Sequence, residues 1–199
     1  MKLHYSPTSP YVRKVVACAV ARGIDAQLER TETNPHVSPP DLLAHNPLSK
    51  VPCLVTEDGL ALFDSPVICE YLDSVGDERP LFPPAGPARW RALRQQAIGD
   101  GIMDAAVARR MDQGRPQEDA RDAFMDRQAA AVERALDLLE ADVPAQHVDI
   151  GAIAIACALG YLDLRFAADA WRTSRPKLAA WYEVMAARPE IAGTAPPKV

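Results

Sequence analysis

Apolar positions in the first third of the chain form short extended runs separated by two helical stripes. Runs typical of strands lie at residues 3–5, 27–31, 53–56 and 60–63. One helical face is formed by positions 12, 15, 16, 19 and 20, and a second by positions 67, 68, 71 and 72. The pattern predicts the order strand, helix, strand, loop, strand, strand, helix.

Both predicted helices are preceded by the same start signal, a serine followed by a proline. Serine is a preferred N-cap, and proline is tolerated in the first turn because an N–H there has no helical partner. The pairs are Ser9-Pro10 and Ser65-Pro66. Between the last two strands, Asp58-Gly59 is a strong signal for a tight hairpin turn.

The remainder of the chain carries helical patterns alone, at residues 87–110, 117–141, 149–166 and 177–187. The segment 150–162 is apolar nearly all round, as in a helix buried inside a bundle, and Asp149 is placed to cap it. Prolines and glycines between 76 and 87 break any helix there. We therefore expect a mixed α+β domain over residues 1–76, a linker over 77–87 and an all-α domain over 88–199.

Two short motifs together could bind a small peptide that has a free amino-acid head group. They are Lys50-Val51-Pro52 and Asp64-Ser65-Pro66. The helix start at Ser65 favours a ligand carboxylate, while Asp64, just outside the helix, suits the adjoining ammonium. Val51 precedes a proline and is biased to extended geometry, which leaves its N–H and C=O free to pair with the ligand. Lys50 can then reach a second carboxylate. Taken singly, the motifs also fit an ordinary helix start and the entry to an edge strand.

Segments around these motifs resemble the bacterial glutathione S-transferase superfamily: residues 6–14 (SPTSPYVRK), 46–52 (NPLSKVP) and 63–66 (FDSP). Further segments resemble its YibF-type members: 100–104 (DGIMD), 153–157 (IAIAC) and Pro196-Pro197-Lys198. The resemblance covers essentially the whole chain. It implies the glutathione transferase fold, with an N-terminal thioredoxin-like domain, a C-terminal all-helical bundle and a cis Pro52. It also implies that the residues of the two motifs hold glutathione.

Proteins of this family make the thiolate of glutathione available at neutral pH. Ser9 is the candidate catalytic residue. Its hydroxyl can donate a hydrogen bond to the thiolate, and its position at the N-terminus of the first helix adds the stabilisation of the helix dipole. Two alternatives stay open: Ser9 is purely an N-cap, or the hydroxyl donor is Tyr5, near the end of the first strand. Arg13, one turn into the helix, either steadies the anion or is a solvated surface arginine.

The resemblance implies a glutathione transferase that conjugates the thiolate to a small hydrophobic electrophile, with glutathione as co-substrate and no metal. Two other function classes stay open: a glutathione-dependent disulfide reductase or isomerase, and a non-catalytic scaffold that binds protein partners. A mixed disulfide with glutathione needs no protein cysteine, so the sequence does not separate the two enzyme classes. The intact Asp64-Ser65 pair argues against the scaffold, which has no need of it.

Family architecture further implies a homodimer with an interface at residues 70–74 and 91–104, and an electrophile pocket between the two domains. Candidate pocket walls are Ile102, Met103, Ala106 and Arg110, and for the three apolar ones a core face or a dimer contact is at least as good an explanation. Asp100 and Asp104 share one helix face. They form either a solvated pair or a pair from which one carboxylate reaches the glutathione ammonium across the dimer interface.

Composition and charge argue against several other classes of function and site. A net charge of −5 without a long basic run argues against a nucleic-acid surface. The chain starts with a strand pattern rather than a charged and then apolar leader, and its longest charge-free helical stretch is too short for a bilayer, so we expect a cytoplasmic protein without membrane contact. The four cysteines include no Cys-x-x-Cys pair and are expected to be reduced core residues, and the four histidines show no zinc spacing.

Overall fold

The computed structural model describes residues 1–197, which fall into two compact units. The first comprises Met1–Arg89 and the segment that begins at Pro189, and the second comprises Trp90–Arg188. Lys198 of the C-terminal motif lies outside the described residues. The end of the predicted helical domain therefore packs with the first unit.

A four-stranded sheet forms the centre of the first unit. Its strands are β1 (Lys2–Tyr5), β2 (Glu29–Glu32), β3 (Cys53–Val55) and β4 (Ala61–Leu62). Their order is β2-β1-β3-β4, with β1 parallel to β2 and antiparallel to β3, and β3 antiparallel to β4. The four predicted strands are therefore present. In the hairpin between β3 and β4, Gly59 has a φ of 86°, a left-handed conformation that glycine adopts without strain.

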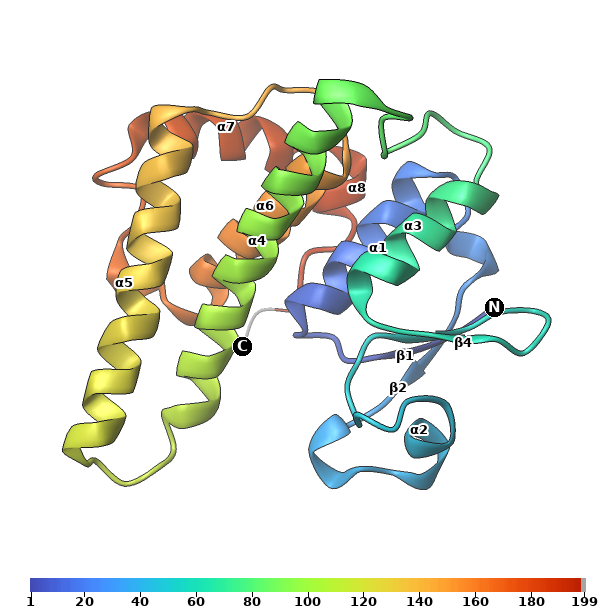
Figure 1. The fold of residues 1–199 in the computed structure, drawn as a ribbon, viewed down its shortest axis with the longest axis horizontal. Coiled ribbons are helices and arrows are strands. Elements are labelled where there is room, and N and C mark those ends of the chain that lie inside the picture. Colours follow the sequence, from blue (N-terminus) through green and yellow to red (C-terminus); the bar gives the residue numbers. More distant parts are fainter. Residues whose placement is uncertain (198–199) are drawn as a thin grey trace. The chain divides into compact units, whose positions relative to one another are not determined.

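Two helices of this unit, α1 (Pro10–Ala21) and α3 (Ser65–Val75), pack against each other. Figure 1 shows them on one side of the strands, with α2 (Pro40–His45) on the other. The sequence predicted only a loop where α2 lies, because a six-residue helix with one buried side chain leaves no apolar stripe. A last short helix, α8 (Pro189–Ala192), packs on α1.

The core of the first unit joins β1 and β3 to the two long helices. Leu3 and Leu54 from the strands and Val15 and Leu72 from the helices are each 0% exposed. Successive side chains of a strand point to opposite faces, so His4, the neighbour of Leu3, points to the face that carries α2. His4 is also fully buried.

The second unit is helical. Its elements are α4 (Gly86–Asp112, which begins in the first unit), α5 (Asp119–Ala141), α6 (Ile150–Arg165) and α7 (Pro176–Ala186). Single-turn 3-10 helices in the chain lie at Asp25–Gln27, Pro35–Val37 and Ala167–Asp169. Every residue of α6 from Ile150 to Leu162 is buried, and the Asp149 carboxylate accepts a hydrogen bond from the backbone N of Ala152 at 2.8 Å. Both features confirm the sequence predictions.

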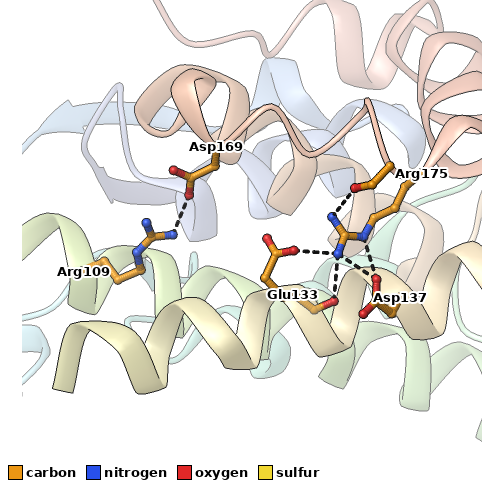
Figure 2. Close-up of polar contacts among 6 residues, drawn as sticks. Arg109, Glu133, Asp137, Asp169 and Arg175 are labelled. Carbon is orange, nitrogen blue, oxygen red and sulfur yellow. Dashed lines mark hydrogen bonds and ion pairs between the residues drawn. The ribbon is translucent and has the colours of Figure 1, made fainter. Parts of the chain in front are cut away.

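Two arginines tie the helices of the second unit together (Figure 2). The Arg175 side chain, only 6% exposed, donates to Glu133 at 2.6 Å and to Asp137 at 2.7 Å, both on α5. Arg109 of α4 pairs with Asp169 at 2.9 Å. Because Arg175 is paired with two carboxylates, the desolvation cost of burying its charge is offset.

All four cysteines are buried, which confirms the prediction that they are core residues, and none of them forms a disulfide within residues 1–197. Across residues 1–197, no helix has both the length and the apolar character that crossing a membrane requires.

Candidate functional site

The register of the sheet brings the predicted binding segments to one end of it. His4 of β1 pairs with Cys53 of β3, so β3 begins where β1 ends. Because Leu54 pairs with Leu62 in antiparallel fashion, β4 ends at the same end of the sheet at which β3 begins. The loop after β1, the segment before β3 and the segment after β4 therefore meet at one end of the sheet.

These three segments contain all five residues predicted to hold glutathione. Ser9 follows β1, Lys50 and Val51 precede β3, and Asp64 and Ser65 follow β4. Helices α1 and α3 both begin here, and the positive ends of their dipoles face the same region. The arrangement favours a ligand that carries negative charge at two points.

Ser9 is the N-cap of α1. Its Oγ accepts a hydrogen bond from the backbone N of Val12 at 3.3 Å, and its C=O accepts from the N of Arg13 at 3.0 Å. A hydroxyl that accepts one hydrogen bond still carries its own proton to donate. Ser9 is half-buried, so capping and donation to a ligand thiolate are compatible.

Helix α3 begins at Ser65, as predicted, but its N-cap is Asp64. The C=O of Asp64 accepts the first helical hydrogen bond, from the N of Ile68 at 3.1 Å, which corrects the prediction that Ser65 is the cap. Ser65 is 2% exposed. No side chain caps the helix, so the backbone N–H groups of its first turn stay available for a ligand.

The Asp64 carboxylate is exposed. Among the residues that the structure describes, it has neither a hydrogen-bond nor an ion-pair partner. A carboxylate beside a helix N-terminus and without an internal cation is suited to bind the ammonium group of a ligand.

The peptide bond between Val51 and Pro52 is cis, which confirms the inference from resemblance. Val51 lies just before β3 and outside the ladder of the sheet. Lys50 is exposed, and its C=O accepts a hydrogen bond from Asn46 Nδ2 at 2.9 Å, which anchors the loop that carries both residues.

Arg13 and Tyr5 have different surroundings from those of Ser9. The guanidinium of Arg13 donates to the C=O of Ile191 at 3.1 Å, so it ties α1 to α8 and is not a solvated surface group. Tyr5 is the last residue of β1 and is half-buried.

The candidate pocket walls on α4 include three apolar residues that are at most 1% exposed: Ile102, Met103 and Ala106. Of the explanations open for these positions, the structure shows the core face.

The sequence analysis missed a polar cluster on the α2 side of the sheet. His4, Asp41 and His45 come together there. Burial lowers the pKa of His4, and the hydrogen bond from Lys2 lowers that of Asp41. The only local signal is the spacing of Asp41 and His45, which puts them on one face of a helix.

Comparison with known proteins covers both units. Models of the glutathione S-transferase N-terminal and C-terminal domains match residues 8–75 and 122–184. The Escherichia coli K12 protein named "Uncharacterized GST-like protein YibF" is 36% identical over 203 residues, which span 100% of both chains.

Solved bacterial structures share the fold along nearly the whole chain. A glutathione transferase family member from Pseudomonas fluorescens Pf-5 with bound glutathione is 42% identical over 98% of both chains, with a TM-score of 0.92. A second structure of that protein holds S-(propanoic acid)-glutathione, with 41% identity, coverage of 99% and 100%, and a TM-score of 0.89. A glutathione S-transferase from Methylobacillus flagellatus KT with bound glutathione is 36% identical over 98% of this chain and 99% of that one, with a TM-score of 0.89.

Proposed function

We propose that this chain, which belongs to the glutathione S-transferase family, binds reduced glutathione at the end of its sheet and conjugates the thiolate to a small hydrophobic electrophile. The single observation that carries the proposal is the register of β1, β3 and β4, because it gathers two helix N-termini, a free carboxylate and an extended backbone segment. The relatives with bound glutathione support the choice of ligand.

Each charged part of glutathione has a counterpart among the residues at this end of the sheet. The γ-glutamyl carboxylate lies on Ser65 and the first N–H groups of α3, and the adjoining ammonium faces Asp64. The cysteinyl residue pairs with the backbone of Val51 as an added strand does. Lys50 is exposed and long enough to meet the glycyl carboxylate.

Ser9 then lowers the pKa of the bound thiol. A free thiol titrates near ~8.5, and lowering its pKa by two units requires roughly 2.7 kcal/mol of preferential thiolate stabilisation. A hydrogen bond from the Ser9 hydroxyl and the dipole of α1 together supply an amount of this order. In the conjugation, the thiolate sulfur forms a bond to the electrophilic carbon, and a leaving group such as halide departs with its electron pair.

The binding test is calorimetry with reduced glutathione on the protein without an affinity tag. Asp64→Asn removes the charge that faces the ammonium and should weaken binding by on the order of 1–3 kcal/mol. Asp77→Asn is the matched control, because Asp77 is exposed and lies outside the three site segments. Equal affinity in wild type and Asp64→Asn would remove Asp64 from the site, and a wild type that binds no glutathione would overturn the proposed function.

The reaction class is tested with a panel of an aryl halide, a hydroperoxide and a mixed disulfide of glutathione. Turnover of the aryl halide is the result expected of a transferase. Turnover of the mixed disulfide alone would assign the reductase class, and binding without any turnover would assign the scaffold. A homodimer and a cytoplasmic location are further parts of the proposal, drawn from family architecture and from the sequence.

A further inference from the structure

Three side chains that are far apart in the sequence converge between β1 and α2. One ligand atom each from His4, Asp41 and His45 lies within 4.8 Å of the others. His4 Nε2 is 3.3 Å from His45 Nδ1 and 3.9 Å from Asp41 Oδ2. The proposed glutathione site uses none of the three.

The hydrogen bonds of His4 determine which of its ring nitrogens carries the proton. Thr33 Oγ1 donates its hydrogen to the C=O of Thr31 at 3.0 Å. The 3.1 Å bond between that oxygen and His4 Nδ1 must therefore be donated by the ring. His4 Nε2 consequently keeps its lone pair, and this lone pair faces His45 and Asp41. A histidine held in one tautomer by an outer hydrogen bond is typical of a metal ligand.

The spacing of the ligand atoms fits a small tetrahedral ion. Zinc–nitrogen bonds of about 2.0–2.1 Å place two ligands of a tetrahedron about 3.3–3.4 Å apart. The separation of His4 Nε2 from His45 Nδ1 is 3.3 Å. The Asp41 oxygen is farther away, but its side chain is 58% exposed and has room to move toward the two nitrogens.

Access to the cluster comes from the solvent side. His4 is fully buried and preorganised, whereas Asp41 is exposed and His45 is half-buried. Three protein ligands leave the fourth tetrahedral position to water.

We propose that His4, Asp41 and His45 form a binding site for one divalent transition-metal ion of the zinc type, separate from the glutathione chemistry. The two imidazoles and one carboxylate are ligands that suit zinc better than magnesium or calcium. The bound ion links β1 to α2 and so stabilises the first unit.

Two groups compete with the ion. His45 Nδ1 donates to the C=O of Asp41 at 2.9 Å, so metal binding moves its proton to Nε2, and the ring stays neutral. Lys2 Nζ lies 2.9 Å from Asp41 Oδ2 and repels a cation. Removing that ammonium should therefore tighten metal binding, an effect that a purely structural cluster does not produce.

The test is calorimetric titration of the tag-free, metal-stripped protein with Zn²⁺ in the absence of thiols. One ion should bind per chain, and Co²⁺ in its place should give the visible absorption of a four-coordinate site. His45→Ala and Asp41→Ala should abolish this binding, whereas the matched control His147→Ala should keep it, because His147 is exposed and its partner is Asp149.

Two further variants address the surroundings of the ligands. Thr33→Val removes the hydroxyl that orients His4 and should weaken zinc affinity by about 10–100-fold. Lys2→Met should lower the dissociation constant, and zinc should raise the melting temperature of wild type but not of His45→Ala. Zinc affinity that is the same in wild type, His45→Ala and Asp41→Ala, or the absence of stoichiometric binding by wild type, would overturn the proposal.

Discussion

At the scale of single residues, Ser9 has two roles that one substitution would confuse. Ser9→Ala removes the proposed thiolate donor and also a helix cap worth about 0.5–2 kcal/mol, whereas Ser9→Gly keeps most of the capping energy. Both variants should raise the thiol pKa of bound glutathione toward ~8.5, while only Ser9→Ala loses appreciable thermal stability. Ultraviolet titration of the bound thiolate measures the first effect and thermal melting the second. A wild-type thiol pKa in both variants would make Ser9 a cap alone, and Tyr5→Phe the next variant.

A second residue-scale prediction concerns Cys53, whose pKa burial raises to about 11. The raised value means that the neutral thiol is favoured, and at pH 8 the thiolate is on the order of one part in 1,000. Since the other three cysteines are also buried, native protein at pH 8 should resist a thiol-specific reagent, and four thiols should react after unfolding in denaturant. Rapid modification of the folded protein would show that a cysteine is accessible, and would bring a protein thiol into consideration for the chemistry.

At the scale of elements, glycine determines how closely α4 approaches α6. A Cβ added at Gly99 would lie 2.6 Å from the carbonyl carbon of Ala154, whereas one at Gly101, in the same helix, meets nothing within 4 Å. Gly99→Ala should therefore destabilise the fold by on the order of 1–3 kcal/mol. Gly101→Ala should stabilise it by up to about 1 kcal/mol, because alanine is the better helix former. Denaturant unfolding measures the free energy of unfolding of both variants. Equal changes in that free energy would mean that α4 and α6 can move apart to accommodate the added methyl group at no cost.

At the scale of the whole molecule, the proposed homodimer makes a prediction about Trp90. Its side chain is 69% exposed in the single chain and it precedes the interface expected at residues 91–104. Trp90→Glu should convert a dimer into a monomer at micromolar concentration, because it replaces a large exposed apolar side chain next to the expected interface with a charge, and charged residues are depleted at interfaces. Sedimentation velocity measures the mass. Leu138→Glu, an exposed position on α5, is the control that should stay dimeric, and a monomeric wild type would contradict the dimer.

The sequence by itself determined the features that depend on neighbours a few residues away. The Ser9 cap, the Asp149 cap and the turn at Asp58-Gly59 each involve groups within four positions, and the all-round burial of α6 follows from its composition. The candidate glutathione residues were found in the same way, because helix starts and X–Pro segments carry their own local signals.

Only the tertiary structure decided which of those groups meet. The pairing of His4 with Cys53 places the segments of Ser9 and Val51 at one end of the sheet, where the pairing of β3 with β4 also brings Asp64, and no local pattern contains the register of β1 with β3. The same holds for the contact of Arg13 with Ile191, 178 residues away, and for the approach of His4 to His45. Such contacts depend on how buried faces of distant segments fit together, and this packing is a property of the assembled fold rather than of any window of sequence.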